Sequence, residues 1–249
     1  MTLSTLKYTF SLIVLSSFSV FAQEKALPAA DTVAVAIAPV KTDRYGIRIG
    51  ADISRPARAF YDKDFKGIEL VADYRLTKKI YAAAEVGTVD YRVEDDLLDF
   101  TTKGSYIKLG FDYNTYENWL DMENMVYTGI RYGFSSFSQN LNAYTIYDTS
   151  DYFPDVVVRP DKKFNGLSAH WVELIGGLKA ELFDNLFLGV SVRLNILLTD
   201  KKPENFDNLY IPGFNRTYDG NFGVGFNYTL SYFIPLYKKQ NVIPKEAKK

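Results

Sequence analysis

The 249-residue sequence contains no cysteine, which excludes disulfide bonds and thiolate metal sites. The formal net charge is only −1, which argues against a nucleic-acid-binding protein held by a global positive field. Beyond the amino terminus, no segment has the ~18 continuous apolar residues of a transmembrane helix. Aromatic residues, in contrast, make up 16% of the chain, with 19 tyrosines and 18 phenylalanines. This content is high for a soluble domain and is typical of a β-barrel with aromatic girdles at membrane interfaces.

The first 22 residues have the layout of a secretory signal peptide. Lys7 precedes an apolar run at residues 10–21, and the small residue Ala22 precedes Gln23. We therefore predict export and cleavage after Ala22. An uncleaved membrane anchor is the alternative, but the apolar run is short for a membrane span. Residues 23–43 are rich in Ala, Val and Pro and are predicted to form a periplasmic linker, although residues 32–40 are also compatible with a short strand.

The clearest structural pattern lies in residues 171–199, where apolar and polar residues alternate on both sides of Asp184-Asn185. Successive strand side chains point to opposite faces, so this alternation predicts two strands joined as a hairpin. At about twice the usual strand length, they are long enough to cross a bilayer when tilted. Six further alternating segments occupy residues 44–54, 65–76, 80–93, 102–113, 125–136 and 221–236. The predicted fold class is all-β, an eight-stranded antiparallel up-and-down transmembrane β-barrel spanning residues 44–237.

The third of these segments contains an irregularity. Its alternation blurs at residues 88–91, and we expect a β-bulge there that returns Tyr91 and Val93 to the apolar face.

The connections between the predicted strands differ in length at the two ends. Those after strands two and six are tight, and the one after strand four is moderate. Long connections occupy residues 55–64, 94–100, 137–165 and 200–220. Outer-membrane barrels have short periplasmic turns and long outer loops, so both termini are predicted to be periplasmic.

The two faces of the predicted strands indicate which side is outside. A soluble lipocalin-like barrel would point the Leu, Ile, Phe and Tyr face inward, but eight strands enclose too little space for so many bulky residues. The opposite face is rich in glycine, as a crowded lumen requires. The apolar face is therefore predicted to contact lipid.

The same argument places a set of charged residues inside the barrel. Because buried charges persist only when they are paired, we expect a salt-bridged plug; the alternative is an ion or proton pathway. The predicted lumen network consists of Arg48, Asp52, Glu69, Asp73, Arg75, Glu85, Lys108, Asp112, Arg131, Glu173, Lys179, Glu181 and Arg193.

With its signal peptide, alternating strands and aromatic last strand ending Tyr-Phe-Ile-Pro-Leu-Tyr at residues 232–237, the chain resembles the small outer-membrane barrels of Gram-negative bacteria, the OmpA/OmpX-like superfamily. It is especially similar to uncharacterised barrel families of about this size. The resemblance implies an outer-membrane location, contact with outer-membrane lipid, and insertion by the barrel-insertion machinery. The aromatic signal usually ends the chain, whereas here residues 238–249 follow. This basic tail, with five lysines and one glutamate, is predicted to face the periplasm, where the cell wall is one possible contact.

Candidate catalytic chemistry is sparse. The single histidine, His170, lies two residues after Ser168, a pairing that acyl transfer would use, but no third residue is assigned to orient it. A girdle histidine is the simpler interpretation. Asp148, Asp151 and Asp155 carry oxygen ligands suited to calcium but lack a recognised loop pattern. We therefore predict no catalytic residue, no metal and no cofactor.

The long loops are unusually aromatic. Their rings either pack on one another, on strands that extend beyond the membrane, or form a recognition surface. The candidate contact residues are Tyr144, Tyr147, Tyr152, Phe153, Tyr210, Phe214 and Tyr218.

The sequence thus favours a non-enzymatic barrel with a plugged lumen, acting in envelope integrity or surface binding. The alternatives are a hydrolase or acyltransferase acting on outer-leaflet lipid, and a narrow channel. Nucleic acid is not an expected partner, whereas an unidentified surface or cell-wall partner remains possible.

Overall fold

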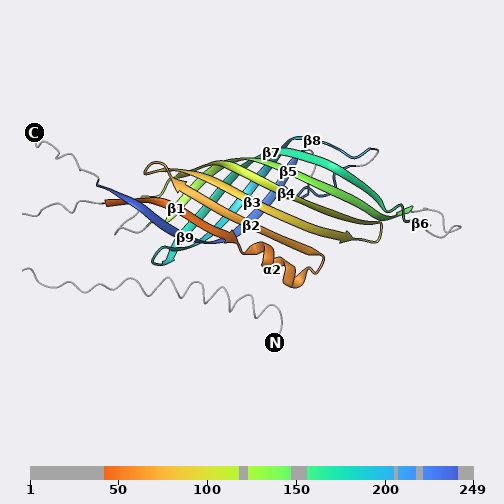
Figure 1. The fold of residues 1–249 in the computed structure, drawn as a ribbon, viewed down its shortest axis with the longest axis horizontal. Coiled ribbons are helices and arrows are strands. Elements are labelled where there is room, and N and C mark those ends of the chain that lie inside the picture. Colours follow the sequence, from red (N-terminus) through yellow and green to blue (C-terminus); the bar gives the residue numbers. More distant parts are fainter. Residues whose placement is uncertain (1–41, 118–122, 147–155, 205–206, 217–220, 241–249) are drawn as a thin grey trace, which may run out of the picture. The chain divides into compact units, whose positions relative to one another are not determined.

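Eight antiparallel strands close into a ring in the computed structural model, which describes residues 42–117, 123–146, 156–204, 207–216 and 221–240. Each strand pairs with the next along the chain, and the last pairs with the first (Figure 1). The predicted all-β, up-and-down antiparallel architecture is confirmed. The strands of the ring are β1 (Thr42–Asp52), β2 (Phe65–Arg75), β3 (Ile80–Glu94), β4 (Leu98–Asn114), β5 (Met125–Ile146), β7 (Lys162–Phe183), β8 (Leu186–Asp200) and β9 (Phe222–Gln240).

Two smaller elements complete the described chain. Strand β6 (Val156–Val158) pairs with the outer end of β5. Helix α2 (Ser54–Tyr61) follows β1 directly, within a stretch that the sequence suggested was a loop. Within the described ranges, no helix has the length and hydropathy that crossing a membrane requires.

The hairpin of β7 and β8 turns at Asp184-Asn185, as predicted from the sequence. Asn185 has φ of 65°, a left-handed conformation that asparagine tolerates better than most residues, which suits it to a tight turn.

The predicted loop at residues 137–165 is wrong at both ends. Strand β5 continues to Ile146, and β7 begins at Lys162, so each has 22 residues. In these extensions the buried positions hold Phe137 and Leu141, with the polar Gln139 between them, whereas Ser138 and Asn140 face outward. The alternation continues there with its polarity reversed, and a search for an apolar outer face therefore misses it.

The predicted bulge at residues 88–91 is also wrong. Strand β3 pairs with β2 and β4 without any shift in register. Val89 is 1% exposed on the inside, and Tyr91 packs its ring against Phe65 and Tyr210, with centroid distances of 5.5 and 5.1 Å. The chain is regular at this position, and the environment of its two faces changes instead.

This change divides the barrel into two regions. Toward the short-turn end, the outside is apolar and the inside is charged. The exposed apolar band includes Ile49, Ile68, Leu70, Val86, Ile107, Leu109, Phe111, Val126, Ile130, Leu174, Leu178, Val192, Leu194, Val224, Phe226, Leu230, Tyr232 and Ile234.

Toward the long-loop end, the inside is apolar. We call this cluster the aromatic core; its buried members are Phe65, Val89, Phe100, Tyr106, Phe137, Leu167, Ala169, Trp171, Leu197, Tyr210, Ile211 and Phe214. The outside of this region carries ion pairs such as Lys103–Asp90 at 2.7 Å and Arg92–Asp99 at 2.8 Å.

The predicted signal peptide at residues 1–22 lies outside the described residues, as do nearly all of the 23–43 linker and most of the basic tail. Strand β1 begins at Thr42 and β9 ends at Gln240, so the barrel extends slightly beyond the predicted limits of 44–237.

Candidate functional site

The most distinctive chemistry of the molecule is a network of paired charges inside the barrel. Six carboxylates and six cations take part, and eleven of these twelve residues are less than 10% exposed. We call this set the charged lumen. Its members are Asp52, Glu69, Asp73, Glu85, Asp112, Glu173, Arg48, Arg55, Lys108, Arg131, Lys179 and Arg193.

Two cations from opposite sides of the ring hold three glutamates at the centre of the network. Arg193 on β8 bonds Glu85 at 2.5 and 3.1 Å and Glu173 at 3.0 Å. Lys108 on β4 lies 3.1 Å from Glu173, 3.5 Å from Glu85 and 3.7 Å from Glu69. These contacts join β2, β3, β4, β7 and β8 across the interior, so the lumen is filled by side chains in mutual contact.

A second group of pairs lies closer to the short turns. Asp73 accepts a hydrogen bond from Arg48 at 2.8 Å and another from Lys179 at 2.6 Å. Arg131 pairs with Asp112 at 2.8 Å. The cavity left among these side chains measures only ≈30 Å³, a volume on the order of one water molecule.

At the short-turn end, the interior is closed by a third group. Glu123 lies 3.2 Å from Arg44 and 3.6 Å from Arg75, and Arg44 also reaches Glu181 at 3.3 Å. Burial raises the pKa of Glu123, and the two arginines only partly offset this rise.

The structure places every predicted lumen charge inside the barrel. Arg75 and Glu181 belong to the short-turn group, Glu181 with its side chain 16% exposed, and the other eleven belong to the charged lumen. The geometry is that of a network in which each charge has an oppositely charged partner within 4 Å.

Sequence reasoning missed several participants, among them Arg55, Asn227 and Trp171. Arg55, on α2, bonds Glu69 at 3.0 Å. Asn227 on β9 donates to Asp52 at 2.8 Å and to Glu69 at 2.6 Å. The indole of Trp171 donates to Glu173 at 2.7 Å. For Trp171 a signal was present, because it shares the face of Glu173 two residues along the same strand.

The neighbours of Arg55 favour its charged form. Burial lowers the pKa of its guanidinium, but Glu69, Tyr106 and Asp52 raise it further, so the net pKa lies above its ordinary value. A cation from a connecting helix thereby neutralises carboxylates of the barrel wall.

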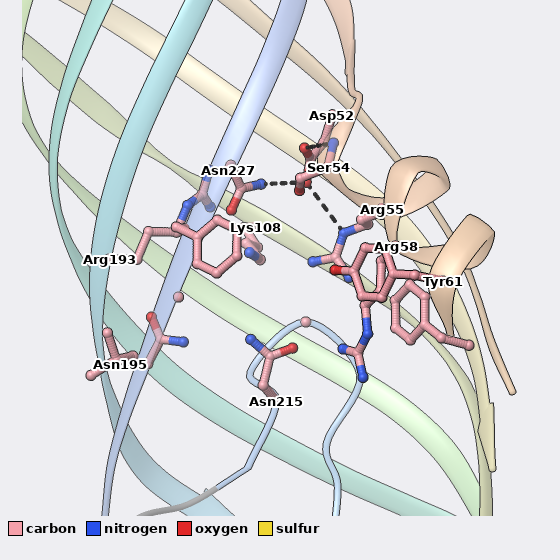
Figure 2. Close-up of a pocket in the computed structure, with 15 residues that line it drawn as sticks. Asp52, Ser54, Arg55, Arg58, Tyr61, Lys108, Arg193, Asn195, Asn215 and Asn227 are labelled. Carbon is pink, nitrogen blue, oxygen red and sulfur yellow. Dashed lines mark hydrogen bonds and ion pairs between the residues drawn. The ribbon is translucent and has the colours of Figure 1, made fainter. Parts of the chain in front are cut away.

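A cavity of ≈120 Å³ lies between the charged lumen, α2 and β9. Figure 2 shows Arg55, Arg58 and Tyr61 entering it from α2, opposite Lys108, Arg193 and Asn227. Asn215, from the connection between β8 and β9, closes its outer side.

Two of the loop aromatics that were candidate contact residues do not lie on the surface. Tyr210 and Phe214 are 2% and 0% exposed, because the connection between β8 and β9 folds into the barrel mouth and joins the aromatic core. The prediction that these two residues contact a partner is wrong, because they are buried. Tyr144 is half-buried. Tyr147, Tyr152, Phe153 and Tyr218 lie outside the described residues, as do Asp148, Asp151 and Asp155.

His170 lies on the outer face of β7. Its Nδ1 is 2.7 Å from the hydroxyl of Tyr132, and its ring packs against Phe134 at 4.8 Å. These contacts are those of a girdle histidine, and the described residues bring no carboxylate into hydrogen-bond contact with its ring.

Comparison with known proteins identifies the family. The family model described as "Domain of unknown function (DUF6048)" matches residues 5–239, and the chain belongs to this family. No curated protein matches the chain. Among solved structures, the chain is similar to the crystal structure of Ail, the attachment invasion locus protein of Yersinia pestis. This match has a TM-score of 0.37 and 12% identity, and it covers 76% of this chain and 97% of that one.

Proposed function

We propose that this DUF6048 protein is a transmembrane β-barrel of the outer membrane, with a closed lumen and a non-enzymatic role in envelope integrity or surface binding. The observation that carries the proposal is the polarity of the barrel toward its short-turn end, where the outside is apolar and the inside is charged. A band of apolar side chains, many of them 40–64% exposed, surrounds a lumen of six carboxylates and six cations. Exposed apolar surface on this scale is tolerated in lipid and costly in water.

Labelling of introduced cysteines tests the membrane position. The natural chain has no cysteine, so a single introduced thiol is the only one present. Lys103 and Leu109 both point outward from β4, but Lys103 lies in the polar outer region and Leu109 in the apolar band. On intact cells, a membrane-impermeant maleimide is expected to label Lys103→Cys and to leave Leu109→Cys unlabelled. Equal labelling of both positions contradicts the proposed orientation and membrane position.

The paired lumen favours a structural role over a channel. An ion crossing the barrel would have to displace partners of Arg193 and Asp73, because the cavity that these two residues line is about the size of one water. We expect no single-channel conductance in planar bilayers. Steady conductance steps from the purified protein would replace the closed-lumen proposal with a channel.

The lipid-modifying alternative rests on Ser168 and His170. Their outward position and the contacts of His170 with Tyr132 and Phe134 support a girdle role. Deletion of the gene is therefore expected to leave the mass spectrum of lipid A unchanged and to alter envelope permeability or surface adhesion. A change in lipid A that His170→Ala reproduces would favour the enzyme.

A further inference from the structure

The wall of the barrel has a gap beside α2. Strand β1 pairs with β2 only from Ile47 to Ala51, and its pairing with β9 ends at Asp52 and Thr229. Ile53, just after β1, still donates its backbone N–H to the carbonyl of Tyr228 at 2.7 Å. Beyond this bond, β2 and β9 continue outward to Phe65 and Phe222, and no described strand pairs with them on this side, where α2 packs instead. Helix α2 lies at the end of β1, beside this opening (Figure 1).

The cavity of ≈120 Å³ lies at this gap, and residues from both faces of the wall line it. Its inner lining includes Lys108 and Arg193, which are 1% and 4% exposed. Its outer lining includes Val224 and Phe226, which are 57% and 64% exposed on the apolar band. A ligand entering from the membrane at this position would therefore reach charged side chains of the lumen.

Hydrogen-bond donors dominate the polar lining. Four cations line the cavity, Arg55, Arg58, Lys108 and Arg193, against one carboxylate, that of Asp52. The glutamates that pair with Arg55, Lys108 and Arg193 are not part of the lining.

Some of these donors are unused. The Nε–H groups of Arg55 and Arg193 are buried and make no hydrogen bond among the described residues; Arg55 Nε lies 3.6 Å from Asp52 Oδ2, too far for a hydrogen bond. An unmet buried donor costs free energy, and an anionic acceptor forms stronger hydrogen bonds with guanidinium than a neutral one.

The surroundings of the cavity are those of an amphiphile-binding site. Phe60 and Tyr61 at the end of α2 are 88% and 77% exposed, and Phe226 projects from the neighbouring strand. Aromatic side chains of this kind are enriched at membrane interfaces. An unpaired strand edge is also costly in hydrocarbon, which favours a polar group bound at the gap.

We propose that this cavity binds the phosphate headgroup of a membrane lipid, which enters sideways between α2 and β9, with its acyl chains against Phe226, Phe60 and Tyr61. The inference rests on the proposed membrane position of the barrel. Arg55 and Arg193 supply donors to the phosphate, and Arg58 and Lys108 supply further positive charge.

Native mass spectrometry of the full-length protein in maltoside micelles tests the proposal. Two probes with the same acyl chains are compared, phosphatidylglycerol and diacylglycerol, which lacks the phosphate. We expect retained phosphatidylglycerol, no retained diacylglycerol, and no displacement by inorganic phosphate. Equal retention of the two lipids overturns the proposal, and displacement by inorganic phosphate would indicate a site for free phosphate instead.

A cavity-filling variant localises the bound lipid. A Cβ added at Gly225 would lie 3.7 Å from Asn215 Nδ2 and 3.9 Å from Arg193 Cβ, which are ordinary contacts with two lining residues. Gly225→Leu is expected to occupy the cavity and weaken retention of phosphatidylglycerol by about tenfold or more. Gly176→Leu is the matched control, because a Cβ there meets nothing within 4 Å and Gly176 does not line the cavity.

Arg58→Gln is a milder second variant, since Arg58 lies outside the charged lumen and pairs with Asp62. We expect it to lower retention by a few fold without changing heat-modifiable migration. Unchanged lipid retention in both Gly225→Leu and Arg58→Gln overturns the proposed site. A barrel that needs detergent but retains no phosphatidylglycerol contradicts this inference alone, whereas a protein soluble without detergent contradicts the proposed function.

Discussion

The charged lumen and the aromatic core are built from the same strands with opposite polarity. On β3, Glu85 faces inward beside the exposed Val86, whereas four residues farther along Val89 faces inward beside Asp90. The backbone pairing is regular through this change. In a uniform solvent one of the two regions would expose the wrong face, so the difference supports the proposal that the barrel passes from lipid into water near this level.

The largest effect is expected from breaking a central charge pair. Arg193→Met leaves Glu85 and Glu173 without their arginine in a buried site, which costs about 3–5 kcal/mol. The measurement is the free energy of unfolding in urea with micelles present. Adding Glu85→Gln should recover part of the loss, because the uncompensated charge is reduced. A loss within about 1 kcal/mol would mean that the lumen is well hydrated, as in a surface ion pair.

Deleting a ring from the aromatic core should cost somewhat less. Phe214 is 0% exposed and packs edge-on against Trp171 at 5.9 Å. Phe214→Ala removes these contacts and leaves a cavity, at a cost of about 3 kcal/mol in the same unfolding experiment. Phe111→Ala is the control, because Phe111 is 54% exposed on the apolar band. Similar losses for both variants would contradict a packed aromatic core.

Trp171 makes one of the contacts between the two regions. Its ring packs in the aromatic core, and its Nε1 donates to Glu173 in the charged lumen at 2.7 Å. A Cβ at Gly133 would clash with the indole, so only glycine leaves room for this ring on β5.

Trp171→Phe should keep most of the packing and lose the hydrogen bond, at a cost of about 1–3 kcal/mol. The loss should shrink when Glu173 is already glutamine, which a double-mutant cycle measures. A loss independent of residue 173 would assign the role of Trp171 to packing alone.

The region around the charged lumen was predictable from the sequence, because one pattern holds along its strands: apolar residues that face outward alternate with residues that face inward. Alternation with an apolar outer face located the strands and placed charges such as Lys108 and Glu173 inside. The same pattern failed where the outward-facing residues become polar, which is why residues 137–146 were expected to be a loop and residues 88–91 a bulge.

Other parts of the site depend on contacts distant in sequence. Arg55 contacts Glu69 from a short helix, and the residue pattern of β1 and β2 does not predict that contact. The inward folding of Tyr210 and Phe214 depends on a turn near Gly213, with φ of 85°, and on the space left in the barrel mouth. Aromatic content alone does not distinguish such a plug from an exposed recognition surface.

The smallest change in the free energy of unfolding should come from replacing an arginine on the outer face of the barrel. Arg92 bonds Asp99 through two nitrogens at 3.0 and 2.8 Å, distances similar to those of arginines within the lumen, but its side chain is 44% exposed. Water competes for both partners and salt screens them, so Arg92→Ala should leave the free energy of unfolding unchanged within error. Because Arg92 and Arg193 are both paired arginines on strands of one barrel, the difference between their variants isolates the effect of environment. A loss for Arg92→Ala as large as that for Arg193→Met would show that the outer region is not surrounded by water, and the proposed boundary of the membrane would have to move outward past Asp90 and Lys103.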